Sequence, residues 1–366
     1  MDNGLLLKNE ETAFRLRRLY RSYGYRPYKM SKFEEYDLYV RNKSFLISEN
    51  ILTFTDLDGK LMALKPDVTL SILKNGRGGP GLQKVYYNEN VYRPSATDRS
   101  YREIPQTGLE CIGRLDGVAE GEVLMLAAKS LALISGEYLL DVSHQGIVTG
   151  LLEEQPLDEQ ARRQALAAMG AKNVPALRQL AAGGALPRET AESLCRLALL
   201  YDRPAPALKE LRPLVKNERM RTALRELEQL CALMEQRGLS ENLRLDFSIA
   251  NDMNYYSGVI FRGFVPGLAA GVLAGGRYDH LLHRMGREGG AIGFAVYLDQ
   301  LERFAAAPPG EVDVLVLYDG SVSAGRVAAE ADALVAAGNT VRVERAVPPD
   351  LGFGRLLDLR EGGGQG

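Results

Sequence analysis

Cysteine and histidine are scarce in this chain of 366 residues, with only three of each. Cys111, Cys195 and Cys231 have no paired spacing, so they predict neither a disulfide framework nor a zinc site. His280 and His283 share one helical face, but no nearby cysteine or carboxylate completes a set of metal ligands. This usage is typical of a reducing cytoplasm, where we expect the protein to work without a metal.

Long apolar runs and an excess of one charge are also missing. No run reaches the ~18 residues that a membrane span needs, and the first residues lack the basic-then-apolar pattern of a secretory signal. The formal net charge is −2, whereas a protein that holds a large polyanion usually carries a basic surface. We therefore expect no membrane contact and no tRNA partner.

The spacing of apolar residues predicts an α+β fold. A helix over 11–23 ends at Gly24, and strands over 51–55 and 60–64 alternate around Asp58-Gly59, which is a strong hairpin signal. Helices and strands then alternate irregularly, which favours an antiparallel sheet flanked by helices over a doubly wound sheet. The predicted strands are 83–92, 104–114, 138–142, 243–247, 258–264, 270–274 and 291–296, and the predicted helices are 120–135, 278–285 and 298–305.

Composition divides the chain into segments. Residues 145–240 are rich in Ala, Leu, Arg, Glu and Gln and are broken by Pro and Gly, which predicts a string of short helices inserted between two halves of the sheet. We expect a first domain over 1–305, a linker over 306–311, and a C-terminal segment over 312–366. That segment should hold one β-α-β unit, with strand 312–318, helix 324–337 and strand 340–343, and a disordered Gly-rich tail.

Polar residues gather on the hairpin predicted over 83–114. Arg93 ends its first strand, and Gln106 and Glu110 lie four apart on the second, so their side chains project from one face. A carboxylate on that face needs a hydrogen-bond donor if it is buried. The hairpin alone is equally consistent with a surface element that carries solvated charges.

Several motifs, in order along the chain, resemble histidyl-tRNA synthetase, a class II synthetase. They are Lys65–Thr69, Gln106–Gly113, Asn254–Gly258, Gly275–Asp279 and Gly290–Leu301. The resemblance covers about residues 10–305 and implies the synthetase sheet flanked by helices, with a truncated remnant of the C-terminal module.

The resemblance also implies roles for individual residues. Asp67 and Thr69 match the groups that hold the α-amino group of the amino acid, although both are also suited to capping the following helix. Arg93 matches the arginine that binds the α-phosphate and the reacting carboxylate.

The imidazole end of this pocket has its own set of residues. Gln106 and Glu110 match the strand that faces the imidazole of histidine, and the resemblance makes that imidazole the donor that Glu110 needs. Tyr255 and Tyr256 match an aromatic pair, one member of which packs against the bound ring. Two adjacent tyrosines could also belong to the core and rim of a sheet.

Several catalytic residues of the synthetase family are replaced in this chain. Asn251 and Gln300 stand where the synthetase family places arginines around the triphosphate, and Ser95 replaces a glutamate. Losing one preorganised donor commonly costs ~10²–10³ in rate. We therefore expect no catalytic residues, no adenylation and no cofactor.

A synthetase-like chain with these losses resembles the regulatory subunit of ATP phosphoribosyltransferase. That family implies a non-catalytic partner of the short-form catalytic transferase subunit, in the first step of histidine biosynthesis, under feedback by histidine. We therefore expect a self-paired dimer that activates the transferase within a hetero-oligomer and binds histidine. Two alternatives stay open: a stand-alone histidine-binding or adaptor paralogue, and an active histidyl-tRNA synthetase.

Overall fold

The computed structural model describes residues 7–42, 51–76, 81–95, 100–154, 156–250, 255–302 and 312–360. The chain divides into two compact units, Met1–Glu302 and Arg303–Gly366. The linker expected over 306–311 and the Gly-rich tail lie outside the described residues. In the described ranges, no helix is both long and apolar enough to cross a membrane.

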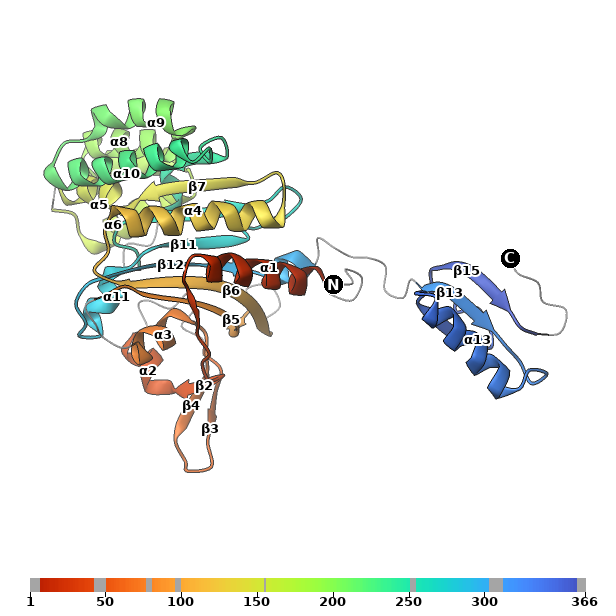
Figure 1. The fold of residues 1–366 in the computed structure, drawn as a ribbon. Coiled ribbons are helices and arrows are strands. Elements are labelled where there is room, and N and C mark those ends of the chain that lie inside the picture. Colours follow the sequence, from red (N-terminus) through yellow and green to blue (C-terminus); the bar gives the residue numbers. More distant parts are fainter. Residues whose placement is uncertain are drawn as a thin grey trace. The chain divides into compact units, whose positions relative to one another are not determined.

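The first unit is built on a nine-stranded sheet, so the predicted α+β class is confirmed (Figure 1). Most neighbouring strands run antiparallel, but β1 pairs with β5, and β7 with β9, in parallel, so the sheet is mixed. In sheet order, the strands are β1 (Arg26–Pro27), β5 (Gln83–Pro94), β6 (Tyr101–Gly113), β12 (Gly290–Tyr297), β11 (Leu273–Arg277), β10 (Val259–Phe264), β7 (Leu139–His144), β9 (Leu243–Asp246) and β8 (Tyr201–Asp202).

Alternation along the central strands separates two faces of this sheet. Leu109 and Phe294 belong to a core cluster that includes helices α1 (Lys8–Ser22) and α4 (Gly117–Ile134), and the Phe294 ring contacts that of Tyr20 edge-on. Their neighbours on the other face pack in a second cluster with α3 (Thr69–Asn75) and α11 (Asp279–Arg284). Because side chains alternate along a strand, Gln106, Gly108 and Glu110 share this second face.

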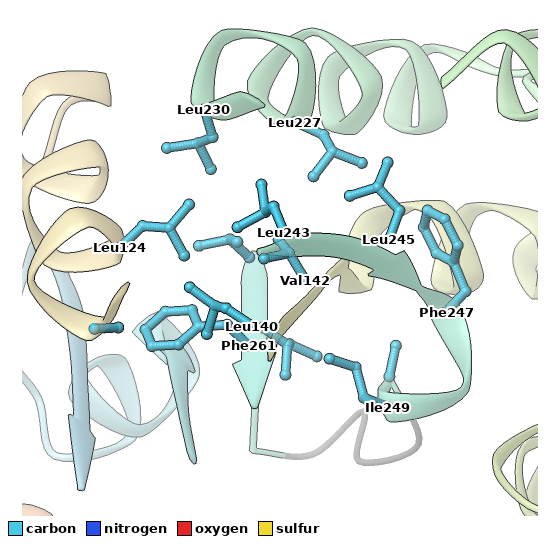
Figure 2. Close-up of a cluster of buried hydrophobic side chains, with 14 of the residues drawn as sticks. Leu124, Leu140, Val142, Leu227, Leu230, Leu243, Leu245, Phe247, Ile249 and Phe261 are labelled. Carbon is cyan, nitrogen blue, oxygen red and sulfur yellow. The ribbon is translucent and has the colours of Figure 1, made fainter. Parts of the chain in front are cut away.

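The predicted helical insertion is confirmed as a layer packed on the far end of the sheet. Figure 2 shows Leu227 and Leu230 of α10 facing Leu243 and Leu245 of β9, with Leu124 of α4 beside them. Each such side chain contributes about 1.5–3 kcal/mol by leaving water, so the insertion is part of the main core. Its helices are α5 (Gln145–Glu153), α6 (Glu159–Gly170), α7 (Val174–Ala182), α8 (Arg188–Leu199), α9 (Pro204–Leu211) and α10 (Glu218–Gln236), with the 3-10 helix η2 (Arg212–Leu214) before α10 and η3 (Phe247–Ile249) after β9.

A small three-stranded sheet contains the predicted hairpin. β3 (Thr53–Thr55) and β4 (Leu61–Leu64) pair antiparallel, and β4 also pairs with β2 (Phe33–Glu35). Gly59 has φ +80° in the turn, a conformation that glycine adopts at no steric cost. The short helix α2 (Tyr36–Arg41) follows β2, and its Tyr39 is buried in the second core cluster.

Two predictions need correction. The strand expected at 270–274 begins three residues later, as β11, and includes Gly275 and Gly276. Glycine usually weakens a strand, but a side chain at Gly275 would collide with Phe294, and one at Gly276 would lie 2.8 Å from the Tyr256 ring. Close packing on both faces therefore requires glycine here.

The second correction concerns the C-terminal unit, where the expected single β-α-β unit is incomplete. A third strand, β15 (Phe353–Asp358), lies parallel to β13 (Val312–Leu317), on the side opposite β14 (Val341–Glu344). The helix α13 (Ala324–Ala336) connects β13 and β14. Gly354 and Arg355 interrupt the apolar pattern of β15, which explains why the sequence gives a weak strand signal there.

Candidate functional site

A cavity of about 320 Å³ opens on the second face of the large sheet, beside the start of α3. Strands β5, β6, β10, β11 and β12 supply most of its lining, and the segment before β10 supplies two tyrosines. The structure brings all the predicted pocket residues together in its wall: Asp67, Thr69, Arg93, Gln106, Glu110, Tyr255 and Tyr256.

Glu110 is the more enclosed of the two carboxyl groups that line the cavity, with 2% of its surface exposed against 8% for Asp67. Thr69 Oγ1 donates to Glu110 Oε1 at 2.8 Å, and the Tyr278 hydroxyl donates to Oε2. Gly293 faces it from β12, where a side chain would collide with the carboxylate. Burial raises the pKa of Glu110 to about 8, against the lowering effect of the two hydroxyls. At pH 7 this carboxyl is therefore mostly protonated.

The titration of Glu110 should make stability depend on pH. Its pKa is raised from 4.5 to about 8 in the folded chain, so the unfolded chain ionises first and stability falls as the pH rises between these values. Glu110→Gln keeps the shape and, like the protonated carboxyl, offers the two hydroxyls one donor and one acceptor, but it does not titrate. Near pH 8 it should be more stable than the parent chain by on the order of a few kcal/mol, with little difference near pH 4.5.

Urea unfolding of both chains at several pH values measures this difference. Glu103→Gln is the matched control, because Glu103 lies on the same strand but is exposed. Parallel stability–pH curves for the parent chain and Glu110→Gln would show that folding does not raise the pKa of Glu110.

Asp67 and Arg93 meet at the start of α3. Asp67 Oδ1 accepts from the Leu70 amide at 3.0 Å, while Oδ2 lies 3.9 Å from Arg93 Nη2. Arg93 Nε also donates to the Pro66 carbonyl at 2.8 Å. Burial raises the pKa of Asp67, which the Arg93 guanidinium and two backbone amides partly offset. Asp67 thus caps the helix and faces the cavity at once, whereas Thr69 directs its hydroxyl to Glu110.

Gln106 presents an unused donor to the cavity. Its Nε2 is buried and has no hydrogen-bond partner among the described residues. Leaving such a group unpaired costs about 1–3 kcal/mol, and a ligand with an acceptor atom would recover that cost.

An aromatic wall completes the enclosure. The Tyr255 and Tyr256 rings meet edge to face with centroids 4.7 Å apart, and Tyr278 lies 5.9 Å from Tyr255. A wall of rings beside a buried carboxyl suits a flat, polar ligand group.

The structure adds three residues that the sequence did not single out. Tyr278 contacts Glu110, although it was visible only as part of the Gly-Gly-Arg-Tyr-Asp motif. Lys65 is buried, with its Nζ 2.5 Å from Glu89 Oε2. Arg262 of β10 lines the cavity, and an isolated arginine on a strand carries no motif that could reveal it.

Three other residues from the sequence motifs are not among the described residues of the cavity wall. Asn251 and Asn254 fall outside the described residues. Gln300 lies on α12 (Asp299–Glu302), where its Nε2 donates to Asp299 Oδ2 at 2.9 Å, and it is not part of the cavity lining. In the described part of the chain, no group of three or more His, Cys, Asp or Glu side chains could hold a metal ion.

Residues 6–301 match the family model for histidyl-tRNA synthetase. Two curated relatives are ATP phosphoribosyltransferase regulatory subunits, each 30% identical to this chain. The one from Thermus thermophilus aligns over 82% of this chain and 80% of its own length. The one from Caldanaerobacter subterraneus aligns over 80% and 77%. The chain belongs to the family of ATP phosphoribosyltransferase regulatory subunits.

Solved structures agree with this family at the level of the fold. A Bacillus halodurans protein described as an ATP phosphoribosyltransferase regulatory subunit/histidyl-tRNA synthetase is 25% identical, with a TM-score of 0.76 over 96% of this chain and 94% of its own. A chain of the ATP phosphoribosyl transferase (HisG:HisZ) complex from Thermotoga maritima is 19% identical, with a TM-score of 0.63 over 79% and 97%. The regulatory-subunit family therefore shares the class II synthetase-like sheet described above.

Proposed function

We propose that this chain is the non-catalytic regulatory subunit of an ATP phosphoribosyltransferase. It activates a short-form catalytic subunit in the first step of histidine biosynthesis and makes that subunit sensitive to histidine. The observation that carries the proposal is an enclosed, polar cavity combined with Asn251 and Gln300 at the positions of two catalytic arginines. A ligand cavity that is retained while the catalytic arginines are lost supports binding rather than catalysis.

Histidine is the effector that this cavity suits best. Glu110 and Gln106 can pair with an imidazole, Asp67 with an α-amino group, and Arg93 with a carboxylate, since all four line one space. The Tyr256 ring supplies a flat wall. Because Glu110 is mostly protonated at pH 7, it can donate to a neutral imidazole or ionise against a charged one.

Aminoacylation is proposed to be lost, together with tRNA binding. Two arginines and the motif glutamate replaced by Ser95 are missing around the ancestral triphosphate site, and the net charge of −2 offers little attraction to a polyanion. The cysteines are buried and free, which supports work in the reducing cytoplasm.

Self-pairing is supported by an exposed apolar patch on the small sheet. Phe33 is 46% exposed, its ring packs edge-on against the half-buried Phe54, and the strand register places the half-buried Met62 on the same face. Such patches commonly mark interfaces, and a two-fold dimer buries the same patch from both partners. We propose that this sheet pairs two copies before the transferase joins.

The test is to prepare the short transferase with and without this chain. Light scattering gives the mass of each species, and phosphoribosyl-ATP formation is measured with and without histidine. We expect a hetero-oligomer that is severalfold more active than the transferase alone and that histidine inhibits. A transferase that is fully active and histidine-sensitive by itself, or that never co-elutes with the chain, contradicts the proposal.

Two variants locate the effector within that complex. Glu110→Ala should keep activation and lose histidine inhibition, because it removes the group at the centre of the cavity. Glu103→Ala, on the exposed part of the same strand, should change neither. If Glu110→Ala leaves inhibition intact, the chain still activates its partner, but histidine binds elsewhere. Histidine binding without co-elution would favour a stand-alone histidine-binding paralogue.

A further inference from the structure

Arg262 is a positively charged residue of the cavity lining that is not among the residues proposed to bind histidine. It lines the cavity from β10 and is exposed, and it forms no hydrogen bond or ion pair with any residue that the structure describes. By contrast, Arg93 is held by Pro66 and Asp67 on the opposite side of the same space.

The strand register gives the distance between the Cα atoms of Arg262 and Glu110. Arg262 pairs with Ala274, Ala274 with Ala295, and Ala295 with Gly108, which is two residues before Glu110 on β6. Three strand spacings therefore separate β10 from β6, roughly 14 Å, with a further offset of about 7 Å along the strands. Histidine placed as proposed above, with its imidazole at Glu110 and its carboxylate at Arg93, therefore leaves Arg262 available to another group.

The floor next to Arg262 is open. Ala274 and Ala295 share the face of Arg262 by register and line the cavity, and their small side chains leave room above the sheet, whereas the Tyr87 ring lies over Gly108. A longer ligand, or a second one, can lie on this floor with its charged end toward Arg262.

The charges of the lining favour an anion at Arg262. Asp67 faces Arg93, and burial raises the pKa of Glu110 to about 8, so neither carboxyl neutralises Arg262 at pH 7. Asp141 is the cross-strand neighbour of Arg262 on β7. Its Oδ1 accepts from the Tyr201 hydroxyl at 3.3 Å, and within the described part of the chain no ion pair joins it to Arg262.

We propose that Arg262 forms a second subsite of this cavity, which binds the phosphate group of a phosphorylated ligand. A guanidinium presents a rigid fork of donors that matches phosphate oxygens, and its exposed position leaves space for a tetrahedral group. A free phosphate compound and a nucleotide share this chemistry. The subsite goes beyond histidine binding, because it lies apart from Glu110 and uses none of the groups assigned to histidine.

Calorimetry on the full chain with pyrophosphate, ribose 5-phosphate and AMP tests the subsite. At least one of these probes should bind, and Arg262→Ala should weaken it about tenfold or more, the loss expected for a hydrogen bond to a charged group. Arg262→Lys should bind more weakly than the parent, because it keeps the charge without the fork. Binding of all three probes points to the phosphate alone, and binding of AMP only points to a nucleotide.

Control variants separate this subsite from the rest of the protein. Arg237→Ala removes an exposed positive charge at the end of α10 and should leave phosphate binding unchanged. Glu110→Ala should abolish histidine binding but not phosphate binding, and Arg262→Ala should do the reverse, so the two proposals fail separately. The subsite is refuted if no probe binds at millimolar concentration, or if Arg237→Ala and Arg262→Ala weaken binding equally.

Discussion

Exchange of pyrophosphate into ATP, driven by histidine, should be undetectable with this chain. Asn251 and Gln300 replace arginines that the synthetase family places around the triphosphate. Removing one preorganised donor costs roughly 10²–10³ in rate, so two together should cost about 10⁴–10⁶. Labelled pyrophosphate incorporated into ATP, with an active histidyl-tRNA synthetase as the positive control, measures the difference.

A partial repair provides a second arm of this experiment. The double change Asn251→Arg with Gln300→Arg is not expected to restore exchange, because Ser95 still replaces the glutamate of the same site. Clear exchange by the unmodified chain would contradict the regulatory assignment. It would favour an active synthetase.

Removing the Glu89 carboxylate should cost roughly 3–5 kcal/mol of unfolding free energy. Lys65 is buried, with 1% of its side chain exposed, and Glu89 is its ion-pair partner at 2.5 Å. Breaking a buried pair from one side leaves a charge without compensation in the interior, which costs about this much. Urea unfolding of Glu89→Ala at pH 7 measures the loss.

The matched controls test whether the uncompensated charge causes the loss. Lys65→Met combined with Glu89→Ala should recover much of the stability, because no charge then remains buried. Arg212→Ala breaks an exposed pair with Glu228 and should cost no more than about 1 kcal/mol. A double variant that is as unstable as Glu89→Ala would show that packing, rather than charge, is responsible.

Local signals predicted most of the fold. The Asp58-Gly59 turn and the alternation around it gave the small hairpin, and Gly24 ended the first helix where expected. The helical insertion was predicted because stretches of helix-forming residues alternate with proline and glycine. These features depend on neighbouring residues only, which is why one sequence suffices to locate them.

Features that depend on distant partners were harder to predict. β11 continues past its expected end, through Gly275 and Gly276, because these glycines fit closely against Phe294 and the Tyr256 ring, each from another segment. The pocket residues were identified through motif resemblance, and the structure places them in one cavity. Periodicity could not show that Lys65 is buried against Glu89 or that Tyr278 reaches Glu110, because both contacts depend on how segments pack.

The two roles of Asp67 should be conserved to different degrees during evolution. One of its oxygens caps α3, and the other faces Arg93 and the cavity. Asparagine caps helices about as well as aspartate, so a change to asparagine would preserve the fold while removing the charge offered to a ligand. Selection for a folded protein therefore cannot maintain this carboxylate, and only selection on the ligand can. Lineages that no longer need the effector should lose the charge first and keep the helix.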